Sequence, residues 1–285
     1  MDSRQPTRAG RARRGCSRTE VIVTRLRVRY NKRGRVRFLS HRDVARCLER
    51  AVRRAGLPVA YSQGFSPRAR LHFGLALSNG FESDAEFFDV DLVDPGPADP
   101  GSADPVDLRS TMERAVAGHL VGAGGLAERL SSVLPDGIDV AAVVPIAAGT
   151  ASLQDSVEVC TWQFRLVEVP ADALDAAATR LLDRDRVEVT LIRKGKQVSE
   201  DLRPLLGEHS TRMSSEGAVL TIDLGTKPRS VRPVEFLAAL DAPELIGNVA
   251  DVRVLRTHQW INLDGQRCEP ISLPRPSTHA EERAS

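Results

Sequence analysis

The pattern of hydrophobic and polar positions predicts strands and helices in alternation along most of the chain. Between residues 21 and 30, apolar and basic side chains alternate with the two-residue period of a strand that buries one face. The apolar positions are Leu26, Val28 and Tyr30, and the basic positions are Arg25, Arg27 and Arg29. Arginines are unusual in a buried layer, so we expect the second face to be solvated or to bind a ligand.

Residues 40–55 are predicted to form an amphipathic helix. Ser40 with Asp43 three residues later is a short-armed capping box, and Gly56 followed by Pro58 predicts the helix end. Apolar residues gather on one face, at Val44, Leu48, Ala51, Val52 and Ala55. Basic residues gather on the other, at Arg42, Arg46, Arg50 and Arg53. This stripe is either a solvated helix face or a surface that follows phosphates or an acidic partner.

Further patterns predict strands at 71–77, 85–92, 157–167, 187–193, 219–224 and 252–260, helices at 108–121, 126–134, 170–183 and 233–240, and short extended segments at 36–39 and 59–61. Strand–helix–strand followed by strand–helix–strand predicts an α+β fold with ferredoxin-like βαβ units, two in tandem. The predicted organisation is a disordered basic tail (1–19), an N-terminal α+β domain (20–148) with an exposed acidic Pro/Gly linker (94–107), a C-terminal ferredoxin-like domain (149–262) and a loose tail (263–285).

Charge is distributed unevenly along the chain. Residues 1–70 carry 20 Arg and Lys against four Asp and Glu, a net charge of +16, whereas residues 71–285 carry 20 against 34, a net charge of −14. Such a separation indicates a surface for an anion, or two surfaces for different partners. Only four of the 40 basic residues are lysine, so the excess of arginine is no evidence of selection for bidentate phosphate contacts.

Several functional classes lack their sequence signatures. No run of about 18 apolar residues predicts a membrane span, and no apolar segment follows the Arg-rich start as in a secretory signal, so we expect a cytoplasmic protein. No two of the four cysteines, at 16, 47, 160 and 268, form a CxxC or cluster motif, so we expect reduced thiols and no iron–sulfur cluster. P-loop, GxGxxG, HExxH and GxSxG motifs are absent, and we expect no cofactor, no metal and no catalytic residue.

The candidate binding residues are concentrated between positions 41 and 72. A glycine in a Ser/Gln-rich loop can present backbone N–H groups to an anion, and an aromatic ring among arginines suits base stacking. The alternative is a tight loop at a sheet corner with Phe65 in the core. The candidates are His41, Arg42, Arg46, Arg50, Tyr61, Ser62, Gln63, Gly64, Arg68, Arg70 and His72.

Several motifs together resemble one family. They are 38–43 (FLSHRD), 53–58 (RRAGLP), 61–68 (YSQGFSPR), 75–77 (LAL) and 80–83 (GFES), with weaker landmarks at 134–138, 152–153, 193–196 and 201–204. This set resembles the radical-SAM-linked family of bacterial proteins, over roughly residues 22–225. Arg68 departs from it, since relatives commonly have His there, and the insert at 94–107 is a local elaboration. The resemblance implies a domain of unknown function, fused behind a radical-SAM domain or encoded beside one.

Three functions follow as hypotheses. The first is a non-catalytic, substrate-recruiting partner of a separate radical-SAM enzyme that binds RNA through the basic N-terminal surface. The second is a purely protein-facing scaffold whose basic half docks an acidic face of that enzyme. The third is an RNA-processing enzyme that uses His41, His72 or Tyr61 on a ferredoxin-like sheet, an analogy from the fold alone.

Overall fold

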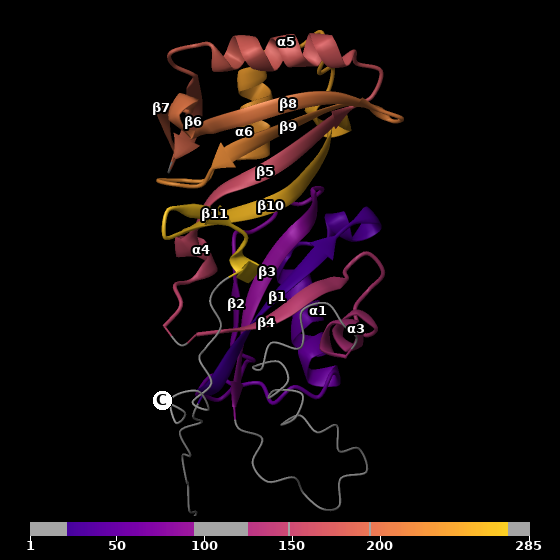
Figure 1. The fold of residues 1–285 in the computed structure, drawn as a ribbon, viewed down its shortest axis with the longest axis vertical. Coiled ribbons are helices and arrows are strands. Elements are labelled where there is room, and N and C mark those ends of the chain that lie inside the picture. Colours follow the sequence, from indigo (N-terminus) through magenta and orange to yellow (C-terminus); the bar gives the residue numbers. More distant parts are fainter. Residues whose placement is uncertain (1–21, 94–124, 148, 194, 273–285) are drawn as a thin grey trace, which may run out of the picture.

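The computed structural model of this chain describes residues 22–93, 125–147, 149–193 and 195–272 (Figure 1). The N-terminal part contains β1 (Ile22–Lys32), η1 (Gly34–Phe38), α1 (His41–Arg54), β2 (Leu71–Phe73), β3 (Glu82–Val93), α3 (Leu126–Ser131) and β4 (Val140–Ile146). The C-terminal part contains α4 (Leu153–Ser156), β5 (Val157–Leu166), α5 (Ala171–Leu182), β6 (Glu188–Arg193), β7 (Lys196–Asp201), η2 (Arg203–Leu205), β8 (Leu206–Ser214), β9 (Gly217–Gly225), α6 (Pro233–Leu240), η3 (Val249–Asp251), β10 (Arg253–Leu263), β11 (Gln266–Cys268) and η4 (Pro270–Ser272).

One nine-stranded sheet runs through both parts. Its order is β4-β1-β3-β10-β5-β9-β8, with β2 beside β3 and β11 beside β10. Neighbouring strands are antiparallel except at the junction of the two parts, where β3 and β10 run parallel and share only two residue pairs, Leu255 with Glu82 and Arg256 with Ser83. The parts are therefore joined edge to edge by a short seam, and other contacts must stabilise the junction.

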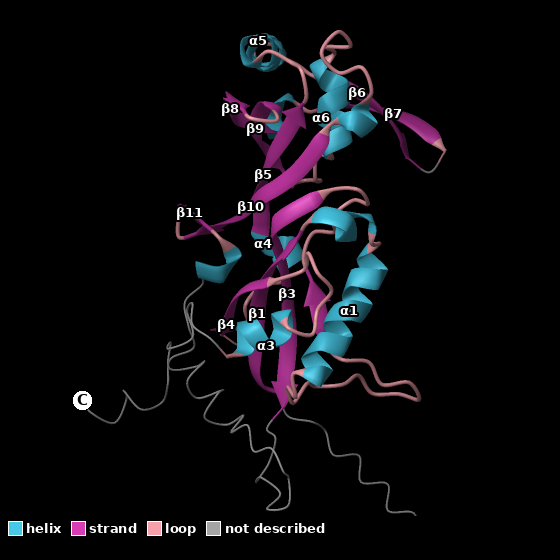
Figure 2. Cartoon of the chain, turned by 90° about the vertical axis from the view of Figure 1, so that its right-hand side faces the viewer, coloured by secondary structure: helices cyan, strands magenta, loops and turns pink. Residues whose placement is uncertain are grey.

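Two hydrophobic cores fill one side of this sheet. In the N-terminal part the apolar stripe of α1 packs on the inward residues of β1 and β3, among them Leu48, Val28 and Phe88. In the C-terminal part α5 and α6 pack on β5 and β9, and Phe164 meets Phe236 with ring centroids 5.0 Å apart. Figure 2 shows α1 and α6 on the same side of the sheet. Charged side chains of α1 are consequently presented to solvent on that side.

The α+β class is confirmed, and several predicted elements lie where the pattern places them. The Ser40 hydroxyl accepts a hydrogen bond from the Asp43 N–H at the start of α1, which is one half of the predicted capping box, while the Asp43 carboxylate accepts from the Ser40 hydroxyl. Strand β5 and helix α6 match their predicted ranges closely. Residues 1–19, 94–107 and 108–121, with their predicted tail, linker and helix, lie outside the described residues.

Three sequence predictions need correction, and one strand was not predicted. Residues 36–39 are not extended, because residues 36–38 belong to the 3-10 helix η1. Lys32 Nζ donates hydrogen bonds to the carbonyl of Arg37 within this helix (3.1 Å) and to that of Leu39 just after it (2.9 Å). The strand predicted at 71–77 is limited to β2. The strand predicted at 187–193 for the main sheet is β6, which pairs with β7 alone. Strand β8 occupies that place in the main sheet instead, beside β9. Strand β4 was missed because its apolar run, VAAVVPI, lacks a two-residue period.

The predicted loose tail is also wrong for its first residues. Strand β11 pairs with β10, and η4 follows it. The arginine face of β1 fixes this segment, since Arg27 Nη1 donates to the Pro270 carbonyl (3.3 Å) and Arg29 pairs with Glu269 (2.9 Å). These contacts bridge more than two hundred residues, so no local pattern could indicate them.

Candidate nucleic-acid interface

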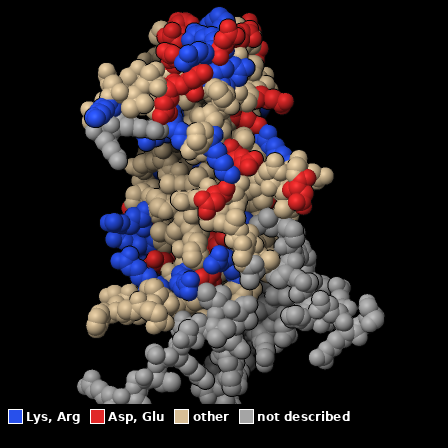
Figure 3. All heavy atoms as spheres, turned by 90° about the vertical axis from the view of Figure 1, so that its left-hand side faces the viewer, with Lys and Arg blue, Asp and Glu red and all other residues tan. Residues whose placement is uncertain are grey.

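Helix α1 presents a stripe of arginine side chains to solvent. Arg42, Arg46 and Arg50 are all exposed. Arg46 lies 3.4 Å from Asp43, but both side chains are about half exposed, and such pairs contribute about 0–1 kcal/mol. Arg42 and Arg50 have no ion-pair partner among the described residues. Figure 3 shows basic side chains gathered along the edge of the molecule that α1 occupies. The stripe therefore has free donors for an anion.

His41 begins this helix and is exposed as well. Its ring meets the ring of Phe73 edge-on, with centroids 5.1 Å apart. Phe73 in turn packs on Phe88 in the N-terminal core. The histidine thus covers the end of β2, next to the arginine stripe.

The loop at 62–68 projects from the end of the N-terminal part. Ser62 N–H donates to the Arg68 carbonyl (2.8 Å), and Arg68 N–H donates to the Ser62 hydroxyl (3.0 Å). Gln63, Gly64, Phe65 and Arg68 are exposed, whereas Tyr61 is half-buried at the base of the loop. Phe65 is not a core residue, so the alternative of a tight corner with a buried ring is wrong.

Arg70 and His72 lie on the other face of the sheet. Both side chains reach the buried carboxylate of Asp91, which Arg70 approaches to 3.2 Å and His72 to 3.1 Å. Arg25 joins the same carboxylate at 2.6 Å. Because successive side chains along an extended segment point to opposite faces of the sheet, Leu71 and Phe73 point into the core while Arg70 and His72 point away from it. The predicted site is therefore divided, with His41 and the α1 stripe on one face and these two residues on the opposite face.

The arginine face of β1 forms ion pairs within the protein, and only Arg25 and Arg29 on it stay partly exposed. Arg27 is fully buried and forms a two-point pair with Asp89, Nε–Oδ1 2.7 Å and Nη2–Oδ2 2.9 Å. Arg25 forms an ion pair with Asp91, and Arg29 forms one with Glu269. Acidic residues of β3 and of the C-terminal segment thus neutralise three arginines that the sequence counts toward a binding surface.

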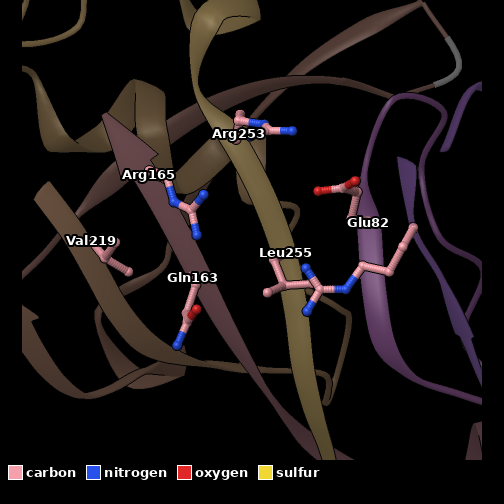
Figure 4. A pocket seen from close by; sticks show the side chains of 7 residues that line it. Glu82, Gln163, Arg165, Val219, Arg253 and Leu255 are labelled. Carbon is pink, nitrogen blue, oxygen red and sulfur yellow. The ribbon is translucent and has the colours of Figure 1, made fainter. Parts of the chain in front are cut away.

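A pocket of about 230 Å³ opens at the seam, on the sheet face opposite the two hydrophobic cores (Figure 4). The side chains of Glu82 and Arg253 extend toward one another across it, and Arg165 lies on the neighbouring strand. Arg165 and Arg253 both pair with Glu216, and Arg33 pairs with Asp84. Carboxylates balance most of the positive charge here, so this pocket is a poorer anion site than the α1 stripe.

A buried polar cluster at the seam was not found from the sequence. Arg256 pairs with Glu86, and Tyr30, Lys32 and Cys160 lie close enough to share their electrostatic influence. Burial raises the pKa of Tyr30 well above its ordinary value and lowers that of Lys32. Burial also raises the pKa of the Cys160 thiol to about 11. The one available signal was the two-residue period of β3, which places Glu86 on the same face as the apolar residues Phe88, Val90 and Leu92.

Within the described ranges, His, Cys, Asp and Glu form no group of three or more that could hold a metal ion. In the same part of the chain, no helix combines the length and apolar character needed to span a membrane. The described cysteines at positions 47, 160 and 268 are free thiols.

The fold and surface together define a mixed α+β protein with an arginine-lined helix and a projecting aromatic loop. Comparison with protein families gives a match over residues 25–113 and 102–233 to a family described as uncharacterized proteins conserved in bacteria, DUF2344. The chain belongs to this family. No match is found among curated proteins.

Proposed function

We propose that this chain is a non-catalytic partner of a separate radical-SAM enzyme and that it recruits RNA through the exposed arginine face of α1. One observation carries the RNA part. Arg42, Arg46 and Arg50 follow one helix face at four-residue intervals, about 6 Å apart along the axis, and two of them have no ion-pair partner among the described residues. Regularly spaced, exposed guanidinium groups can contact successive phosphates of a nucleic-acid strand.

The charge of α1 supports this proposal. The helix carries five arginines, Arg42, Arg46, Arg50, Arg53 and Arg54, against Asp43 and Glu49. The two acids form ion pairs with Arg46 and Arg53, at 3.4 and 3.9 Å, in exposed positions where solvent weakens the attraction. This binding surface is smaller than the net charge of the N-terminal half suggests, because the arginines of β1 form ion pairs with acidic residues of the same chain.

The radical-SAM part of the proposal rests on the family resemblance in the sequence. We place the protein in the cytoplasm as part of the same proposal, which fits the free thiols at Cys47, Cys160 and Cys268, because disulfides are rare there. Co-purification of the chain with a radical-SAM enzyme from its own host tests this part. Two proteins that elute separately at low salt would contradict it.

We also propose that each part of the sheet is a ferredoxin-like unit. In the C-terminal part, β5, α5, β8, β9, α6 and β10 follow in the order strand–helix–strand–strand–helix–strand, with sheet order β10-β5-β9-β8. In the N-terminal part, β4-β1-β3-β2 is the corresponding order. The hairpin of β6 and β7 is then an insertion into the second unit.

That hairpin favours a second candidate function, the protein-facing scaffold. Its two strands pair only with each other among the described strands, and Ile192 on it is 78% exposed. Figure 2 shows the hairpin projecting from the body. A stable complex with the radical-SAM enzyme and no RNA binding at physiological salt would favour this function over the first.

RNA binding is best tested by its salt dependence. Replacing Arg42, Arg46 and Arg50 by alanine removes three phosphate contacts, so the slope of log affinity against log salt should fall by about 2 for single-stranded RNA. The control variant replaces Arg180, Arg184 and Arg212, three exposed arginines of the C-terminal part, and changes the net charge equally. Equal slopes for wild type and the α1 variant would contradict RNA binding by this helix.

A further inference from the structure

The loop at 62–68 is closed at its base by main-chain contacts. Tyr61 and Ala69 form a β-bridge, and Ser62 and Arg68 exchange the two hydrogen bonds described above. Gly64, at the tip, has φ +135°, a region that favours glycine. The loop therefore projects with both of its ends fixed by hydrogen bonds, and it loses little conformational freedom when it binds a ligand.

This loop holds a fully exposed aromatic ring. Phe65 has a relative exposure of 110%, compared with 61% for Phe38, the other exposed phenylalanine of the described chain. The guanidinium of Arg37 covers the ring of Phe38 at 4.6 Å from its centroid. Phe65 has no aromatic or cation contact with any described residue. Both faces of its ring are open to a ligand.

The surroundings of Phe65 fit a nucleobase. Burying a phenylalanine side chain stabilises a folded protein, and this position forgoes that gain. Stacking of a base on an aromatic ring recovers a similar amount. Arg68 is exposed on the same loop and has no ion-pair partner among the described residues, so it can contact the adjoining phosphate.

We infer that Phe65 stacks on an unpaired base and that the RNA bound by this protein is single-stranded where it meets the loop. This inference rests on the proposed function and names its substrate class. Duplex RNA keeps its bases stacked within the helix and presents mainly phosphates and 2′-hydroxyls, which offer nothing for an isolated phenyl ring. Arginines of α1 bind the backbone, and the loop selects for accessible bases.

The test measures binding of the full chain to two fluorescent RNAs of equal length, an unstructured single strand and a duplex. Phe65→Ala should weaken single-strand binding on the order of 10- to 100-fold, with the duplex affinity and the salt slope unchanged. Phe65→Trp should retain single-strand binding because a larger ring stacks as well. Phe38→Ala is the matched control, with no expected effect, and urea midpoints verify that each variant folds.

The outcomes separate this inference from the proposed function. If single strand and duplex bind equally and Phe65→Ala changes neither, the stacking role is overturned while RNA binding stands. If Phe65→Ala weakens only the complex with a protein partner, the ring is a protein contact and the inference is likewise overturned. If neither RNA binds the wild-type chain, the proposed function and the inference fall together.

Discussion

Arg256 on β10 and Glu86 on β3 form a buried ion pair across the seam between the two parts of the sheet. Arg256 Nε lies 3.0 Å from Glu86 Oε1, and Arg256 Nη2 also donates to the Leu75 carbonyl at 2.9 Å. Burial lowers the pKa of Arg256, but Glu86 and Cys160 outweigh it, so the pKa is raised and the guanidinium stays charged. The pair lies beside the two-residue pairing of β3 with β10 and links the parts where main-chain contacts are few.

Glu86→Gln should lower the free energy of unfolding by about 3–5 kcal/mol, because it leaves a buried guanidinium without its counter-charge. Urea unfolding followed by circular dichroism measures the loss. Glu158→Gln is the matched control, since Glu158 is half-exposed and pairs with Lys227 at 3.5 Å, a contact expected to contribute about 0–1 kcal/mol. Equal losses in the two variants would contradict a structural role for the seam pair.

Asp91→Asn should make the protein less stable at neutral pH but not in acid. Burial of the Asp91 carboxyl raises its pKa, yet hydrogen bonds from Arg25 and His72 lower it by more, so the pKa lies below its ordinary value of 3.8. A depressed pKa stabilises the folded state above pH 3.8, and this stabilisation is lost as the pH falls through the folded-state pKa.

Urea unfolding of wild type and Asp91→Asn across this range gives the comparison. We expect a difference of about 1.5–3 kcal/mol at pH 7 that shrinks below pH 3.8. Asp185→Asn, at an exposed position, should match wild type throughout. A difference between wild type and Asp91→Asn that stays constant with pH would show that the Asp91 charge contributes nothing.

Cys160 should resist thiol reagents while the protein is folded. Its pKa of about 11 keeps the thiol protonated at pH 8, and its side chain is buried, whereas Cys47 and Cys268 are partly exposed. In a Cys16→Ser background, iodoacetamide labelling followed by peptide mass spectrometry should find Cys47 and Cys268 modified first. Cys160 should be labelled only after urea is added. Labelling of Cys160 as fast as Cys47 in the native protein would contradict this prediction.

Local elements whose patterns are complete within a few residues could be predicted from the amino-acid sequence. Ser40 and Asp43 predict the start of α1, and the spacing from Val44 to Val52 predicts which face is buried. Exposure of Arg42, Arg46 and Arg50 follows from the same spacing, because a helix that buries one stripe must present the opposite one to solvent.

The roles of the other charged residues depend on contacts between distant parts of the chain. The alternation of β1 shows that Arg27 shares a face with Arg25 and Arg29, but not that Asp89 lies opposite it or that Pro270 covers it. Partners separated by 62 and 243 residues leave no periodic trace in the sequence, so a buried arginine and a solvated one have the same local pattern. The exposure of Phe65 was likewise decided by the fold, since a ring in a glycine-containing loop can turn inward or outward until the loop ends are fixed.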